Sequence, residues 1–109
     1  MSSTATSTSN KKSSDIPSKR LLSAVASLTR WKILNEMTAG EGMMVSTLGT
    51  RVGASAANVS KHMLVLLKAG LVRIGPGRLY HLTDLSHPDP ATNEMDLGGI
   101  VLRFPRRKS

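Results

Sequence analysis

The sequence has no cysteine, few aromatic residues and few acidic ones. The absence of cysteine in this 109-residue chain excludes disulfides, thiolate metal ligands and cysteine nucleophiles together. With one Phe, one Trp and one Tyr, a core has to be built from Leu, Val, Ile, Met and Ala. No apolar run approaches the roughly 18 residues that span a bilayer, and the N-terminus has no apolar segment of the secretory kind. We therefore expect one cytoplasmic domain with no membrane partner.

Catalytic groupings are also missing from the sequence. The three histidines and seven carboxylates are scattered, so no nucleophile, base and orienting group form a recognisable set. The segment Gly75-Pro76-Gly77 is too short for a phosphate-binding loop that opens a helix. We therefore predict that the protein is not an enzyme.

Positive charge dominates the chain and is unevenly distributed. Fifteen basic residues against seven acidic ones give a net charge of +8, which favours a polyanionic partner such as nucleic acid. No acidic residue lies between Glu41 and Asp84, a window that contains Arg51, Lys61, Lys68, Arg73 and Arg78. A second basic group near the end of the chain comprises Arg103, Arg106, Arg107 and Lys108. We predict that the acid-free window makes salt-dependent phosphate contacts, through Arg51, Lys61, Arg73 and Arg78.

The hydrophobic pattern divides the chain into a polar arm, one domain and a short basic tail. Residues 1–14 are mostly Ser, Thr, Asn and Lys without periodicity, and are predicted to be a disordered arm. Residues 15–104 form the predicted domain, and residues 105–109 form the tail. Two helices are predicted first in the domain, at 18–26 and 28–38. Their apolar positions are Leu21, Leu22 and Val25 in the first, and Trp31, Ile33, Leu34 and Met37 in the second.

The segment from Met44 to Val72 carries the most specific signal in the chain. Ser46 is the predicted N-cap of a helix at 47–52, which Gly53 ends, and Ser55 is the predicted N-cap of a helix at 56–69. Gly49 is expected where two helices cross closely. The later helix is polar at its start and has an apolar core stripe of Val59, Met63, Leu66 and Leu67. Two short helices in this arrangement are typical of a helix-turn-helix, whose second helix enters the DNA major groove.

Residues 71–83 are predicted to form a hairpin beside this motif. Strand residues on both sides flank the tip Gly75-Pro76-Gly77-Arg78, so the hairpin would be a wing. The predicted fold is therefore α+β, a winged helix-turn-helix with about four helices. A polar linker is expected over 85–93. After it, GGIVLRF at 98–104 has the alternation of a strand, with Ile100, Leu102 and Phe104 on one apolar face. An uncovered strand of this kind promotes aggregation, so we expect it to complete the core or a dimer interface.

The residues between about Leu21 and Asp84 resemble the winged helix-turn-helix of ArsR-type bacterial repressors. The resemblance is carried by LTRWKIL, then STLGTRVGASAANVSKHMLVLLKAGLV, then GRLYHLTD. It implies a homodimeric regulator that binds double-stranded DNA and acts on the nucleoid. It also implies that Ala56, Ala57 and Asn58 face base edges, while Ser60 and Lys61 contact phosphates or bases. Arg78 would reach the DNA backbone or the minor groove, and Ser55 at the helix start belongs to the same predicted set.

Two residues of the recognition helix are assigned more closely. Asn58 is the best candidate for direct readout, because its amide can pair bidentately with adenine. His62 matches the family pattern, but a structural role in packing or hydrogen bonding is favoured over DNA contact.

The chain departs from ArsR-type metal sensors in three ways. It lacks the cysteine pairs that these sensors carry before the recognition helix, and it lacks the C-terminal helix that carries their alternative Asp and His site. Asp84, His87 and Asp89 lie close together only in a proline-broken loop, so we expect no metal and no cofactor there. The missing closing helix also leaves the dimer geometry open. Leu64 and Leu67 occupy positions that are commonly polar in the family, so we expect something to cover them.

Two other functions remain as alternatives. The small, neutral helix start Ser55-Ala56-Ala57-Asn58 is compatible with a winged helix that binds a protein through Leu64 and Leu67. The two basic ends are compatible with an architectural or RNA-binding protein that has little sequence preference. A pull-down that resists salt would favour the former, and binding that disappears with the tails would favour the latter.

Overall fold

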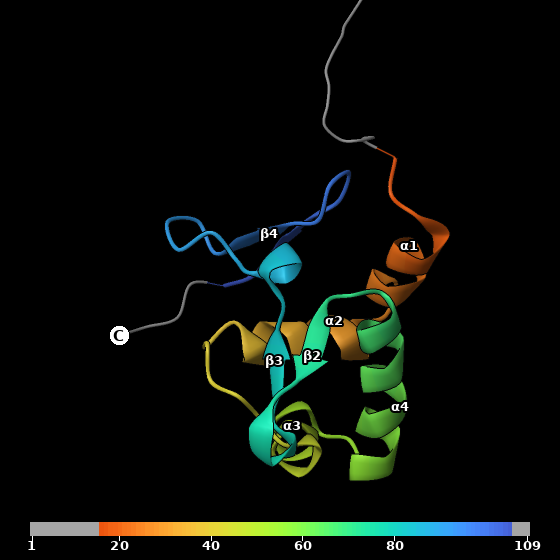
Figure 1. The fold of residues 1–109 in the computed structure, drawn as a ribbon, viewed down its shortest axis with the longest axis vertical. Helices are drawn as coiled ribbons and strands as arrows, with labels where there is room; N and C mark the ends of the chain where they lie inside the picture. The colour runs from red at the N-terminus through yellow and green to blue at the C-terminus, as the bar shows by residue number, and fades with distance from the viewer. Residues whose placement is uncertain (1–15, 106–109) are drawn as a thin grey trace, which may run out of the picture.

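The computed structural model describes residues 16–105, which fold around four α-helices and two short β-hairpins. The helices are α1 (Lys19–Val25), α2 (Leu28–Met37), α3 (Val45–Val52) and α4 (Ala56–Lys68). The strands are β2 (Val72–Ile74), β3 (Tyr80–Leu82), β4 (Glu94–Asp96) and β5 (Val101–Arg103). Figure 1 shows α2 lying across the centre, with α3 below it and α4 along one side. The predicted α+β winged helix-turn-helix is confirmed. The predicted arm at 1–14 and residues 106–109 of the predicted tail lie outside the described residues.

Serine hydroxyls begin three of the four helices. Ser18, Ser27 and Ser55 accept hydrogen bonds from the backbone N–H groups three residues later, at 3.0, 3.2 and 3.1 Å. Each bond satisfies one N–H group that the first helical turn leaves without a partner. The caps predicted at Ser27 and Ser55 are confirmed.

The predicted start of α3 is wrong. Ser46 lies inside the helix, and the N-cap is Met44, which has no capping side-chain bond. The reason is tertiary. The preceding residue, Met43, exchanges backbone hydrogen bonds with Tyr80 of the hairpin at 3.1 and 2.8 Å. The chain therefore leaves this bridge directly into the helix.

The core lies between α2, α3 and α4 and contains no charged side chain. Its fully buried members include Ile33, Leu34, Met37, Leu48, Val59, Met63 and Leu66. The apolar stripe predicted for the first helix is wrong at Leu22, which is 48% exposed, while Ala24 of the same helix is completely buried. Because α1 is only seven residues long, one turn contacts the core, and Leu21 and Ala24 fill that contact. Leu67 of the predicted α4 stripe is only half-buried.

The turn between α3 and α4 is tight because Gly49 has no side chain. A Cβ atom at Gly49 would lie 2.6 Å from the carbonyl oxygen of Ala54, too close for any real contact. The expected close approach is present, although Gly49 meets the turn itself rather than a crossing helix. Gly53 then ends α3 in the left-handed conformation with φ 76°, as predicted.

The hairpin predicted at 71–83 is confirmed as the pair β2 and β3. The strands are antiparallel, with Val72 opposite Leu82 and Ile74 opposite Tyr80. The tip, Pro76–Arg78, is a tight turn in which Gly77 and Arg78 have positive φ values of 73° and 61°. The bridge from Tyr80 to Met43 ties the hairpin to the start of α3. The wing is therefore fixed next to the helix-turn-helix.

A second hairpin closes the domain, and its first strand was not predicted. β4 pairs with β5, and Gly98 and Gly99 form the two-residue turn with φ 78° and 91°. Two consecutive positive φ values are what a type I′ hairpin turn requires. The expected apolar face is present: Phe104 is buried, Ile100 and Leu102 are partly buried, and all pack on the core. The Phe104 ring stacks on Trp31 of α2 at a centroid distance of 5.2 Å.

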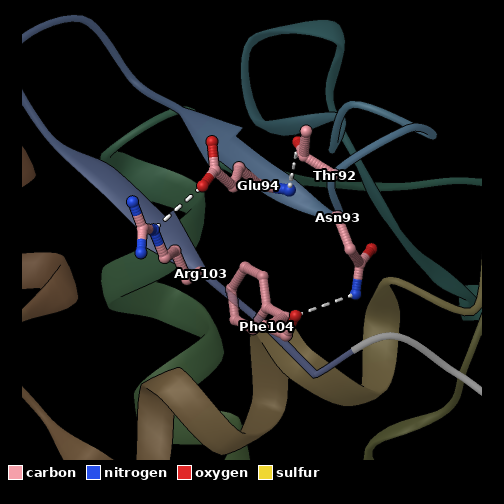
Figure 2. Close-up of polar contacts among 5 residues, drawn as sticks. All are labelled: Thr92, Asn93, Glu94, Arg103 and Phe104. Atoms are coloured by element: carbon pink, nitrogen blue, oxygen red, sulfur yellow. Dashed lines mark hydrogen bonds and ion pairs between the residues drawn. The ribbon is translucent and has the colours of Figure 1, made fainter.

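Polar contacts hold this second hairpin together, as Figure 2 shows. Arg103 forms an ion pair with Glu94 at 2.9 Å, and the Asn93 amide donates to the Phe104 carbonyl at 3.4 Å. The segment predicted as a polar linker, 85–93, is also partly structured. Within it, Ser86 is completely buried, and its hydroxyl donates to the carbonyl of Leu71. The C-terminal segment thus completes the core from within the same chain.

Candidate nucleic-acid interface

Three elements that could meet DNA lie at one end of the molecule. In Figure 1, α3, the first turns of α4 and the tip of the β2–β3 hairpin all lie at the lower end, while the β4–β5 hairpin lies at the upper end. Because the Met43–Tyr80 bridge and the Gly49 turn fix their relative positions, these elements form one preformed surface. The second hairpin covers the opposite side of α2.

Helix α4 presents the predicted base-contacting residues to solvent. Its core positions, Val59, Met63 and Leu66, are completely buried. The predicted set is exposed throughout and comprises Ser55, Ala56, Ala57, Asn58, Ser60 and Lys61. One outer face contains four positions with spacings of four, three and four residues: Ala57, Lys61, Leu64 and Lys68. Asn58 is rotated about 100° from Ala57 and so lies at the edge of that face.

The predicted phosphate-contacting residues are all exposed, but their surroundings differ. Lys61 is exposed on α4. Arg51, at the end of α3, is exposed but forms a 3.5 Å ion pair with Glu36 of α2. The sequence window did not show this partner, because Glu36 lies outside it. Arg73 is exposed on β2, opposite His81 on β3.

Arg78 at the wing tip has an unusual backbone. It is exposed and has φ 61°, a left-handed conformation that is uncommon for a residue with a side chain. Such conformations are held at a cost and occur often at functional sites. The conformation is consistent with a wing whose guanidinium is presented for contact.

The charge of residues 16–105 is separated by element. The elements α1, α3, α4, β2 and β3 contain no acidic residue. The acidic residues of this part lie on α2, on the loop after it, or after β3, and are Glu36, Glu41, Asp84, Asp89, Glu94 and Asp96. The elements of the candidate interface therefore present cations without neighbouring acids on the same elements, which suits a phosphate backbone.

His62 faces the protein rather than the candidate interface. Its Nδ1 atom lies 2.9 Å from the Arg30 guanidinium, which also donates to the carbonyls of Ala24 and Ser23 at 2.7 and 3.0 Å. Burial first, and the Arg30 charge second, lower the pKa of His62 below its ordinary value of 6.5. A neutral His62 accepts from Arg30 and links α4 to α1 and α2. The structure thus gives His62 the structural contact that the sequence favoured.

An apolar groove between α3, α4 and the wing was not predicted. It is lined by Met44, Val45, Ser60, Ile74, Arg78 and Tyr80. Met44 and Ile74 are each about half exposed, at 48% and 52%. The sequence did contain a signal for this groove, because Val72 and Ile74 are alternate apolar residues of one strand. The groove itself depends on the bridge between Met43 and Tyr80, which are far apart in the sequence.

A more polar pocket lies at the other end of the wing, lined in part by Glu41, Arg73, His81, Asp84 and His87. Within residues 16–105, no three His, Asp or Glu side chains come together as a candidate metal site. None of the helices in the same range has the length and apolar character needed to span a membrane.

The arrangement of α3, the Gly53–Ser55 turn, α4 and the β2–β3 hairpin defines a winged helix-turn-helix domain. No protein-family model and no curated protein matches the sequence. Among solved structures, the chain is similar to HlyU from Vibrio cholerae N16961, with 28% sequence identity and a TM-score of 0.52. That match covers 60% of this chain and 73% of the HlyU chain, and it supports the winged helix-turn-helix assignment.

Proposed function

We propose that the protein binds double-stranded DNA in a sequence-specific manner and regulates transcription. The observation that carries this proposal is the preformed surface of α3, the start of α4 and the wing, on elements that contain basic residues and no acidic ones. The likeness to HlyU, a transcriptional regulator with a winged helix-turn-helix, supports it. The ArsR-like subtype and action on the bacterial nucleoid in the cytoplasm are part of the same proposal.

In the proposed mechanism, α4 enters the major groove and the wing lies over the neighbouring backbone or minor groove. Ala56, Ala57 and Asn58, at the start of α4, meet base edges. Ser60 and Lys61 meet bases or the flanking phosphates. Arg51, Arg73 and Arg78 supply contacts with the phosphate backbone, and these contacts weaken as salt rises. Ser55 begins the helix and fixes the position of its first turn.

A homodimer is also proposed. The family resemblance implies it, and α1 offers an exposed apolar position at Leu22, while Leu28 at the start of α2 is 69% exposed. The β4–β5 hairpin packs on its own chain through Phe104 and Trp31, so it does not require a second copy to be covered. The sedimentation coefficient of the full chain, with and without DNA, tests the dimer.

Selection of bound sequences from a random duplex library tests the DNA-binding proposal. We expect a defined motif to be enriched, and expect a two-fold repeat of it if the protein binds as a dimer. Binding without enrichment, lost when the basic ends are removed, would support the architectural alternative instead. A protein partner captured through α4 at high salt, without any DNA affinity, would support the protein-interaction alternative.

A further inference from the structure

The outer face of α4 carries an exposed apolar side chain, Leu64, between two lysines. Leu64 is 56% exposed and lies on the same face as Ala57, Lys61 and Lys68. Neither α1 nor the C-terminal segment buries Leu64. The C-terminal segment packs on Trp31 of α2 through Phe104, and α1 is linked to α4 by a hydrogen bond from Arg20 to the Lys68 carbonyl at 3.4 Å.

The surroundings of Leu64 favour one kind of occupant. Lys61 and Lys68 are exposed three residues before it and four residues after it, and α4 contains no acidic residue. An apolar protein surface over Leu64 would remove water from both ammonium groups without replacing it by negative charge. Duplex DNA gives the lysines phosphates, and in the major groove its base edges carry one apolar group, the 5-methyl group of thymine.

We propose that Leu64 and Ala57 recognise thymine methyl groups in the major groove. This inference rests on the proposed function, and it names the feature of DNA that defines the preferred site. The hydrogen-bonding side chains on or beside this face are few: Asn58, Ser60, Lys61 and Lys68. Apolar contacts therefore supply a large part of the base discrimination. Ala57 and Leu64 are seven residues apart, about 10.5 Å along the helix axis, so the two thymines lie within about three base pairs of each other.

The test uses the full chain and the duplex selected from the random library. Each thymine is replaced in turn by deoxyuridine, which removes the methyl group and keeps the base pairing. We expect replacement at a contacted position to weaken binding about fourfold, the effect of burying one methyl group. In the Leu64→Ala variant, the loss at one of these positions should shrink to less than twofold, while losses at the others remain.

Leu85→Ala is the matched control. Leu85 is a leucine of similar exposure, 50%, in the short turn after β3. We expect this variant to keep every deoxyuridine effect of the unmodified protein. The proposal is therefore supported if Leu64→Ala, and not the control variant, removes the effect of deoxyuridine at one thymine position.

The possible outcomes separate this inference from the proposed function. If the selected duplex outcompetes random DNA but no deoxyuridine replacement weakens binding, thymine-methyl recognition is wrong and DNA regulation stands. If no duplex is preferred over random DNA, the proposed function itself fails. If Leu64→Ala dissociates an oligomer and leaves every deoxyuridine effect unchanged, Leu64 contacts a second copy of the chain and the inference is overturned.

Discussion

At the residue scale, Asn58 is the predicted base-reading side chain with the clearest local setting. Its backbone N–H donates to the Ser55 hydroxyl at 3.1 Å, while its exposed amide has no hydrogen-bond partner within residues 16–105. Asn58→Ala therefore removes base contacts without removing the helix cap. We expect it to weaken binding to the selected duplex by roughly 1–3 kcal/mol and to leave binding to random DNA unchanged. Fluorescence anisotropy on both duplexes measures this, and equal losses would show that Asn58 does not read bases.

His62 makes the stability of the domain depend on pH. Because its pKa is lowered in the folded protein, the unfolded chain takes up a proton at a higher pH than the folded chain. The free energy of unfolding should therefore decrease as pH falls below about 6.5, where the unfolded histidine titrates. Protonated His62 cannot accept from Arg30, and the two positive charges repel each other.

The His62 prediction is checked by thermal unfolding between pH 8 and pH 5. In His62→Gln, the amide oxygen can still accept from Arg30 but does not titrate, so its melting temperature should decline less on acidification. His87→Gln, at an exposed histidine, is the control and should follow the unmodified protein. Parallel curves for all three proteins would exclude His62 as the source of the pH dependence.

At the element scale, local signals predicted the helices better than the strands. Ser27 and Ser55 cap their helices by accepting hydrogen bonds from residues only three positions later. The apolar stripe of Val59, Met63 and Leu66 likewise lies within one helix. Both features are local, so the sequence alone predicts them. β4 was missed because only Met95 of its three residues is apolar, and its pairing with β5 supplies the rest. The start of α3 was misplaced because it depends on the distant Tyr80. The groove beside α4 was missed for the same reason.

The second hairpin should contribute to stability through Phe104. Its ring is 5% exposed and stacks on Trp31, so Phe104→Ala leaves a cavity against α2. We expect a loss of about 3 kcal/mol in the free energy of unfolding, measured by denaturant titration. Val101→Ala, at a side chain of the same hairpin that is 52% exposed, should change it by less than about 0.5 kcal/mol. Similar small effects of both substitutions would mean that the hairpin does not stabilise the domain.

The wing should contribute affinity without sequence preference. Arg78 is exposed at its tip, and a phosphate contact there is independent of the base sequence. Arg78→Ala should weaken binding to all duplexes alike and lower the slope of log affinity against log salt by about one phosphate contact. Lys32→Ala on α2 removes an exposed positive charge from an element outside the candidate interface, and it should leave the slope nearly unchanged. An unaltered slope for Arg78→Ala would remove the wing tip from the interface.

At the scale of the whole molecule, the two ends of the domain differ in their charge and in the elements that form them. The end formed by α3, the start of α4 and the wing is basic and preformed, whereas the opposite end carries the β4–β5 hairpin with Glu94 and Asp96. This polarity orients the protein on a polyanion with the recognition helix toward it. The β4–β5 hairpin, with Asp96 and the Glu94–Arg103 ion pair, lies away from the phosphates.

The most direct test of sequence-specific DNA binding is the ratio of two dissociation constants. One is measured for the selected duplex and the other for a scrambled duplex of the same length and composition, both at about 0.15 M salt. Specific regulators of this kind bind their sites at least about 10³-fold more tightly than non-specific DNA. We predict a ratio of that order for the full chain. Equal dissociation constants would contradict the account, because the basic surface would then bind phosphates without reading bases.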